Sequence, residues 1–397
     1  MRSRGDNIVS QSRSERLTNS LPYQFSRASE NYKISSNEMK SVFRMHVLAA
    51  GHGDSLWIDF GDPQAPTRIL VDSGTQGTSR ELIRALNLVR GESPSHELFI
   101  VTHVDRDHIG GSLAIMENAG IAAQFNEVWF NGWKHLLQAS GRQPFGPVQG
   151  ERLTKALEIM PSKWNAAFAG GPVLRNSSSS ATPMQRQIGE ATVTILSPTS
   201  KELGALLGPW EGEVKGAGMV PGMPPPKQRP SKSGMQALGV RNIERLANTV
   251  VSADAAVANG SSISALLEFE GRRLLLGADA HPAVLLAGIR QIQATGRLAV
   301  DVFKAPHHGS AANVTDALLD AIAPKTVVFS SNGAFFGHPD EVAVARVVRK
   351  YKDQGVELVF NYPTKFNRMW MSPTLQAQWN FTARYGKGDC GITVNLK

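Results

Sequence analysis

The most constraining feature of this chain is a short apolar run that ends in a cluster of ligand-type side chains. Leu98–Val101 is typical of a buried strand, and His103, Asp105, Asp107 and His108 follow it within one turn. Four such side chains at a strand end converge on a small volume, and imidazoles with carboxylates suit borderline or hard divalent cations. The alternative is a polar loop with helix caps, but loops seldom gather this set directly after a buried strand. The pattern therefore predicts a metal site.

The same stretch resembles the signature of a known family. Thr102-His-x-Asp-x-Asp-His-x-Gly-Gly111 is similar to the metal-binding motif of the metallo-β-lactamase fold, with Asp105 where most members have a second histidine. This aspartate form resembles the soluble hydrolase domain of bacterial DNA-uptake channel proteins, the ComEC type, and its stand-alone relatives. The resemblance implies an α/β fold: a four-layer αββα sandwich of two mixed sheets face to face, with helices outside and metals at the rim.

The resemblance covers about residues 43–360 and divides the chain into three parts. Residues 1–40, which are rich in Ser, Asn and Arg, are expected to form a disordered basic tail. Residues 41–365 are expected to form the hydrolase domain, with surface insertions at about 134–187 and 205–250. Residues 366–397 are expected to be a C-terminal extension, with strands at Gln376–Tyr385 and Gly391–Leu396.

Three later strand ends carry further residues that the resemblance assigns to the site. Asp279 follows an apolar strand and is expected to bridge both metals. His307 and His308 follow another strand. Two adjacent imidazoles are not expected to point the same way, so one should bind metal and the other should face substrate or solvent. His338, in the terminal Gly-His-Pro motif, is expected to stabilise the reacting group or to protonate the leaving group.

The resemblance therefore implies two metal sites that share one carboxylate. Ser197 stands where many relatives carry a third histidine, so either the first site has one ligand fewer or another group, such as His281, completes it. Two divalent ions, zinc or manganese, are expected, and they would lower the pKa of a bridging water so that it attacks as hydroxide. The expected first site is His103, Asp105 and Asp279, and the expected second site is the catalytic Asp107 with His108, Asp279 and either His307 or His308.

Other residues are expected to orient the ligands or to bind substrate. Asp54 and Asp72 are predicted to orient metal-bound histidines through their other ring nitrogen, with ordinary turn hydrogen bonding as the alternative. Trp133 and His135 are candidates to line the pocket, but a packed tryptophan and a surface histidine are the favoured interpretation. The predicted substrate-contacting or catalytic residues are Lys304, Ser310, Asn131, Lys227, Arg229 and Lys232.

Composition sets the expected partners and compartment. The formal charge of +8 favours an anionic partner. A single cysteine, Cys390, excludes an internal disulfide and a thiolate metal cluster, and it is consistent with a reducing cytoplasm. No apolar stretch approaches the roughly 20 residues needed to span a bilayer, and the N-terminus lacks an apolar signal region. A cytoplasmic protein without a membrane partner is expected, and no oligomeric state is predicted.

The predicted function is metal-dependent hydrolysis, and a phosphodiesterase or nuclease that acts on nucleic acid is the first choice. This choice rests on the basic charge and on the resemblance to a DNA-handling subgroup. The same metal pair also hydrolyses carboxylic substrates such as a thioester, lactone or amide, and the motifs do not discriminate between the two classes. A third hypothesis is a binding or regulatory module that lost catalysis because Ser197 replaces a ligand.

Overall fold

The computed structural model describes residues 41–89, 96–140, 148–178, 181–207, 242–387 and 391–396. The predictions for the tail at 1–40, for Cys390 and for Lys227, Arg229 and Lys232 lie outside these ranges. Within them, no helix is long and apolar enough to cross a bilayer.

The first of two mixed sheets has the strand order β14-β1-β2-β3-β4-β5. Its pairs are antiparallel from β14 to β3 and parallel from β3 to β5. Positions along β1 alternate between buried and half-buried, because one face packs on the other sheet. The strands are β1 Val42–Val47, β2 Leu56–Gly61, β3 Thr67–Val71, β4 His96–Ile100, β5 Phe125–Trp129 and β14 Ile392–Asn395.

The second sheet has the order β13-β12-β11-β10-β9-β8-β7-β6. Its pairs are antiparallel from β6 to β9 and parallel from β9 to β13. The strands are β6 Gln185–Ile188, β7 Ala191–Ser197, β8 Ser264–Phe269, β9 Arg272–Leu276, β10 Leu298–Lys304, β11 Ile322–Phe329, β12 Val356–Phe360 and β13 Phe381–Tyr385.

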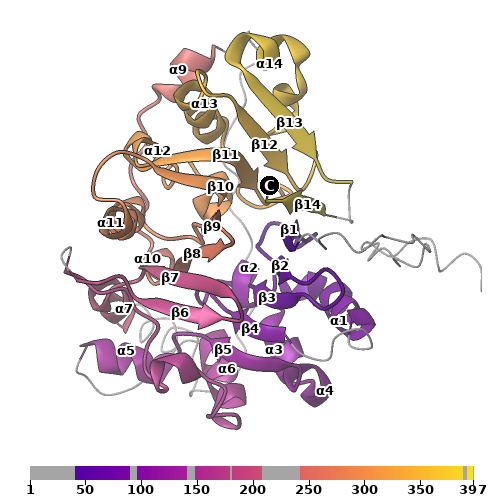
Figure 1. Cartoon of the computed structure of the whole chain (residues 1–397), viewed down its shortest axis with the longest axis vertical. Helices are drawn as coiled ribbons and strands as arrows, with labels where there is room; N and C mark the ends of the chain where they lie inside the picture. The colour runs from indigo at the N-terminus through magenta and orange to yellow at the C-terminus, as the bar shows by residue number, and fades with distance from the viewer. Residues whose placement is uncertain are drawn as a thin grey trace, which may run out of the picture.

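Apolar side chains fill three large cores, which define four layers (Figure 1), and a smaller fourth cluster contains Leu136 and Leu203. Ile58 and Val302 belong to the core between the two sheets. Phe99 lies in the outer core of the first sheet, beneath α1, α3 and α6, and Phe303 lies in that of the second sheet, beneath α11 to α14. The predicted αββα sandwich is therefore confirmed.

Helices and single turns connect the strands. The α-helices are α1 Ser79–Val89, α2 Arg106–Ile109, α3 Ser112–Met116, α4 Ala119–Ala122, α5 Trp133–Ser140, α6 Val148–Glu158, α7 Ser200–Ala205, α9 Ile243–Ala247, α10 Val257–Gly260, α11 Pro282–Ile292, α12 Asp316–Asp320, α13 Glu341–Lys350 and α14 Pro373–Trp379. The 3-10 turns are η1 Gln76–Thr78, η2 Ala166–Phe168, η3 Pro306–Gly309 and η4 Arg368–Met371.

The C-terminal segment departs from the sequence prediction. The expected strand Gln376–Tyr385 is wrong over its first part, where α14 continues to Trp379. The hydroxyl of Ser372 caps this helix by accepting from the N–H of Leu375, and Pro373 occupies its first turn. β13 then pairs with β12, and β14 pairs with β1, so this segment forms one edge of each sheet.

Candidate metal centre

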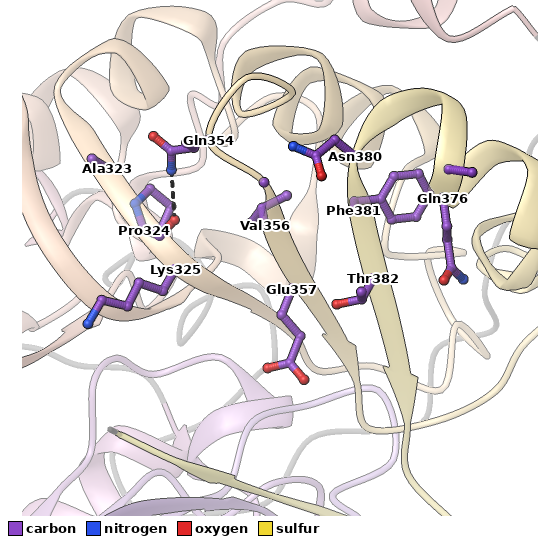
Figure 2. Close-up of a pocket in the computed structure, with 12 residues that line it drawn as sticks. Ala323, Pro324, Lys325, Gln354, Val356, Glu357, Gln376, Asn380, Phe381 and Thr382 are labelled. Carbon is purple, nitrogen blue, oxygen red and sulfur yellow. Dashed lines mark hydrogen bonds between the residues drawn. The ribbon is translucent and has the colours of Figure 1, made fainter.

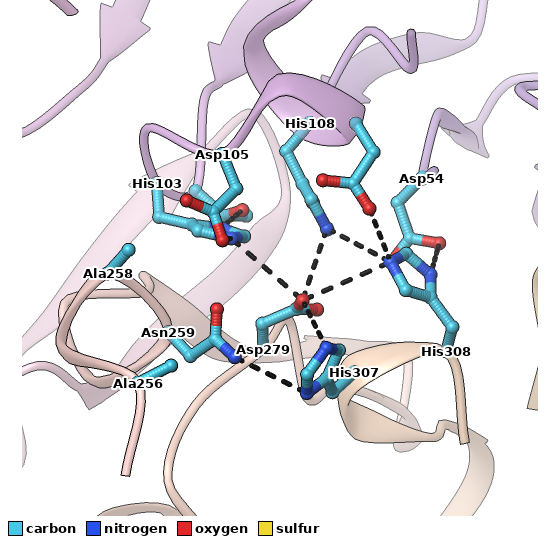
Figure 3. A network of polar contacts seen from close by, with 12 residues as sticks. Asp54, His103, Asp105, His108, Ala256, Ala258, Asn259, Asp279, His307 and His308 are labelled. Carbon is cyan, nitrogen blue, oxygen red and sulfur yellow. Dashed lines mark hydrogen bonds and ion pairs between the residues drawn. The ribbon is translucent and has the colours of Figure 1, made fainter. Parts of the chain in front are cut away.

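Four histidines surround the carboxylate of Asp279, between the turns that follow β4, β9 and β10 (Figure 3). The Nε2 atoms of His108, His307, His103 and His308 lie 3.3, 3.8, 3.9 and 3.9 Å from Asp279 Oδ2. These turns lie at the carboxyl ends of parallel strands, where α/β sheets commonly bind their ligands. The structure thus brings together imidazoles from both halves of the chain at one carboxylate.

Two of these imidazoles are held by groups that can only accept a hydrogen bond. His108 Nδ1 lies 2.7 Å from the carboxylate of Asp72, and His308 Nδ1 lies 3.0 Å from the carbonyl oxygen of Ser330. Both Nδ1 atoms must therefore carry the ring proton in the neutral imidazole. The lone pairs of both Nε2 atoms then face the centre.

The other two imidazoles are held in the same way. The hydroxyl of Thr102 donates to Asp72, so its oxygen accepts from His103 Nδ1, which is 3.0 Å away. His307 Nδ1 lies 3.0 Å from the amide oxygen of Asn313. All four rings are therefore oriented by their Nδ1 atoms, an arrangement typical of metal-ligating histidines.

Two acceptor atoms at the centre have no hydrogen-bond partner among the described residues. They are His103 Nε2 and Asp279 Oδ1, and both are buried. Ligand atoms of His103, His108 and Asp279 lie within 4.8 Å of one another. Buried acceptors are rarely left unpaired, and lone pairs converging on a carboxylate are stable only with positive charge between them. This donor set fits a divalent cation such as zinc or manganese.

The electrostatics of the cluster also favour a cation. Burial alone would raise the pKa of Asp279, but the surrounding imidazoles hold it well below its usual value. Burial would lower the pKa of His308, but the carboxylates of Asp54 and Asp279 raise it to about 10. The centre therefore attracts positive charge, whether a proton or a metal ion supplies it.

The start of α2 supplies two further carboxylates, Asp105 as its N-cap and Asp107 in its first turn. Asp107 Oδ2 lies 3.2 Å from His308 Nε2, and Asp105 Oδ2 lies 3.6 Å from His103 Nε2. The side chain of Asp105 is 44% exposed, so this carboxylate faces solvent. Gly53 allows its turn to approach closely, because a Cβ there would lie 1.8 Å from the carbonyl oxygen of Asp107.

Asp54 lies beside the centre but is committed to other partners. Its Oδ2 is 2.8 Å from Nζ of Lys304, and its Oδ1 accepts from the hydroxyl of Ser330 and lies 3.3 Å from His308 Nδ1. Its carboxylate also comes within 4.8 Å of ligand atoms of His108 and His308. Because both oxygens are occupied, Asp54 holds His308 in place and is not free to act as a metal ligand.

His307 and His308 both turn toward Asp279, contrary to the expectation that adjacent rings point apart. The two residues have φ angles of 46° and 54°, in the left-handed region. That conformation costs a non-glycine residue of order 1–3 kcal/mol and persists where the surroundings enforce it. It rotates both side chains to the same side of η3, which regular strand or helix geometry does not allow.

His307 supplies a further imidazole at Asp279, whereas the two positions considered for a third ligand, Ser197 and His281, are engaged elsewhere. The hydroxyl of the buried Ser197 donates to the carbonyl oxygen of Ser262 at 2.7 Å. His281 Nε2 donates to the carbonyl oxygen of Ala256 at 2.8 Å, so His281 does not complete the site.

His338 lies next to the centre. Its ring centroid is 5.4 Å from that of His307, and its Nδ1 lies 3.2 Å from Asp340 Oδ1. Asp340 also accepts from the backbone N–H of Ala311. These contacts place His338 beside the cluster, with its ring oriented by Asp340.

Three expected substrate contacts have other roles. Lys304 is only 1% exposed and its ammonium is paired with Asp54, so it is not free to bind a phosphoryl oxygen. The side-chain amide of Asn131 both donates to and accepts from the backbone of Val173, at 2.9 and 2.8 Å. Ser310 is buried. The sequence identified these polar side chains, but it did not identify the ion-pair and hydrogen-bond partners that they have in the fold.

His135 is buried and not on the surface as predicted. Its Nδ1 accepts from the N–H of Gly132, and its Nε2 donates to the carbonyl oxygen of Gly170, both at 3.1 Å. Trp133 is packed, as expected. Neither observation gives these two residues a part in the metal centre.

Sequence reasoning missed the residues that hold His307. Asp254 accepts from the side-chain amides of Asn259 and Asn313, at 2.7 and 3.0 Å, and lies 3.2 Å from His307 Nδ1. Three strands and two helices separate Asp254 from His307 along the chain, so no local spacing indicated the contact. Asp340 was detectable in principle, because it lies two residues after His338.

A surface pocket of about 570 Å³ lies at the opposite, amino-terminal ends of β11, β12 and β13 (Figure 2). Its charged residues are already paired: Lys325 with Asp301 at 2.6 Å, and Glu357 with Arg384 at 2.9 Å. The pocket contains none of the predicted ligands and offers no comparable centre.

No known family profile matches the sequence, and no curated protein does. Among solved structures, the chain is similar to the metallo-β-lactamase fold protein YhfI from Bacillus subtilis, with 8% identity over 90% of this chain and 100% of that chain and a TM-score of 0.40. It is also similar to a Cronobacter sakazakii metallo-β-lactamase with a HARLDQ motif (12% identity, 66% and 77% coverage, TM-score 0.27) and to the metallo-β-lactamase SMB-1 bound to 2-mercaptoethanesulfonate (14%, 78% and 95%, 0.29). At TM-scores below 0.5, these similarities add nothing to the reasoning about the site, which rests on the contacts above.

Proposed function

We propose that this protein is a hydrolase that holds two divalent metal ions at Asp279. Four imidazole Nε2 atoms surround the buried carboxylate of Asp279, and the Nδ1 atom of each imidazole is bound to another group. This arrangement is the observation that carries the proposal. The proposed ligands are His103, Asp105, Asp279 and His307 for the first ion, and Asp107, His108, Asp279 and His308 for the second.

When bound, such ions polarise a substrate oxygen and make water nucleophilic near neutral pH. The residues of the chain keep the donor atoms in place. Asp72 holds the Nδ1 proton of His108, and Asp54 fixes His308 from behind. His338, oriented through Nδ1 by Asp340, is the proposed general acid: in its doubly protonated form it would give the Nε2 proton to the leaving group and keep the Nδ1 proton on Asp340.

The proposed substrate is a phosphodiester of nucleic acid. The formal charge of +8 and the aspartate form of the motif support this choice. Lys227, Arg229 and Lys232 are the proposed phosphate contacts. The hypothesis of an impaired module relied on the histidine missing at position 197, and the inward ring of His307 weakens it. Manganese is proposed alongside zinc, because the exposed Asp105 would offer a hard oxygen ligand.

Hydrolysis of two substrate classes tests the proposal. Purified protein is assayed on bis(p-nitrophenyl) phosphate and plasmid DNA, and in parallel on p-nitrophenyl acetate, a lactone and a thioester. The expected result is cleavage of the diester and of DNA, lost with a chelator and restored by zinc or manganese. Turnover of the carboxylic substrates alone would leave a metallo-hydrolase of the other class. Salt-sensitive DNA binding without turnover would indicate a binding module.

A further inference from the structure

Two phenylalanines next to the metal centre are exposed to solvent. Phe335 and Phe336 are 51% and 57% exposed, whereas most large aromatic side chains of the described ranges are buried. Their ring centroids lie 4.6 Å apart at an interplanar angle of 78°. Adjacent exposed apolar rings cost solvation free energy, and such patches often mark a binding surface.

Ring contacts connect this pair to the metal centre. Phe336 stacks on His338 at 5.8 Å, and His338 in turn lies 5.4 Å from His307. On the other side, Phe335 stacks on His52 at 5.2 Å. The N–H of Asp54, two residues after His52, donates to the carbonyl oxygen of Asp107 at 3.2 Å, so this contact also leads back to the centre. The pair therefore lies at the surface beside the centre, between His52 and His338.

The backbone holds the pair in place from below. Gly333 and Gly337 have φ angles of 68° and 82°, and a Cβ at either would lie 2.5 or 3.2 Å from the ring of Phe366. The N–H of Asn332 donates to the carbonyl oxygen of Gly51 at 2.9 Å, which joins the turn that carries Phe335 and Phe336 to the turn that carries His52. These contacts fix the backbone that carries Phe335 and Phe336.

We propose that Phe335 and Phe336 form a stacking platform for a nucleobase of the substrate; this inference rests on the proposed function. A base next to the scissile phosphodiester is planar and can stack on an exposed ring that reaches the centre through His338. The exposed Lys365, whose ammonium lies 5.0 Å from the ring of Phe366, is suited to the neighbouring phosphate. Phenyl rings offer no polar group for base readout, so the platform accepts any base.

Two matched oligonucleotides test the platform. One is a short single-stranded DNA, and the other has the same backbone with every base replaced by an abasic tetrahydrofuran unit. Affinity for the full chain is measured by fluorescence anisotropy, and cleavage is measured separately. Wild type should prefer the base-bearing strand. Phe335→Ala with Phe336→Ala should weaken that binding by roughly 5- to 150-fold per stacked base and leave the abasic strand unaffected.

Two further variants distinguish stacking from general damage. Phe335→Trp with Phe336→Trp should retain the preference, and Ile159→Ala, which removes an apolar side chain that is 83% exposed elsewhere, should change nothing. Equal binding of both strands by wild type, or equal loss of both in the alanine variant, would overturn the platform. Binding and cleavage are measured in separate assays. Base-dependent binding without cleavage would therefore support the platform and count against the proposed function alone.

Discussion

The carboxylates of Asp279 and Asp59 are both buried, and nitrogen atoms surround each of them. Asp59 Oδ2 accepts from the guanidinium of Arg44 at 2.8 Å, Oδ1 accepts from the indole N–H of Trp57 at 2.7 Å, and Arg68 lies 3.5 Å away. Asp279 Oδ2 instead faces four imidazole Nε2 atoms at 3.3 to 3.9 Å, and its Oδ1 has no hydrogen-bond partner among the described residues. The two sites share residue types but differ in their permanent charge.

That difference separates a structural ion pair from a ligand site. Burial would raise the pKa of Asp59, but His46 and Arg44 lower it to about 2, so the chain itself balances this charge. An imidazole whose Nδ1 proton is already bound presents only a lone pair at Nε2. Asp279 and its histidines therefore require a cation from outside the chain, and Asp59 does not.

The largest expected effect follows from removing the charge at the centre. Asp279→Asn should lower kcat/KM on bis(p-nitrophenyl) phosphate by on the order of 10³-fold or more, because the lost charge stabilisation is worth several kcal/mol. Circular dichroism should show an unchanged fold, since the sheets have their own cores. Full activity in this variant would mean that the nucleophile arises elsewhere.

The matching change at the other cluster should act on stability. Asp59→Asn leaves Arg68 buried without its counter-charge and should lower the free energy of unfolding by about 3 kcal/mol. Urea denaturation measures this change. The kcat/KM of the folded fraction should equal that of wild type. A loss of activity without a loss of stability would show that the two clusters do not differ in the way described.

A smaller effect is expected where a carboxylate only orients a ligand. Asp72→Asn removes the negative charge beside His108 Nδ1 and should weaken metal affinity by roughly 10- to 100-fold. Competition with a chromogenic chelator measures the affinity. An unchanged dissociation constant would show that the ring of His108 needs no such partner.

The smallest effect concerns pH. The pKa of Asp59 is about 2 in the folded chain against 3.8 for the free side chain, so its contribution is complete above about 3.8 and is lost as pH falls through about 2. The difference in unfolding free energy between wild type and Asp59→Asn should shrink by about 2 kcal/mol over that window. A difference that stays constant down to pH of about 2 would contradict the ion pair at Asp59.

Local sequence patterns predicted the strand ends and most of the residues that the structure gathers at Asp279, because a strand followed by His103 or Asp279 needs only neighbouring residues. They did not predict that His307 and His308 face the same way, which depends on left-handed backbone at two non-glycine residues. The partner of Lys304 is Asp54, far away in sequence, so the lysine was assigned to substrate. Contacts between the two halves of the chain form only once the sheets pack.

Elemental analysis of protein purified without chelator tests the central claim most directly. Two proposed ligand sets at Asp279 predict about two equivalents of zinc or manganese per chain. Asp279→Asn should reduce that content sharply, and Asp59→Asn should leave it unchanged. Folded wild-type protein that takes up neither metal, even when both are supplied in excess, would contradict the account.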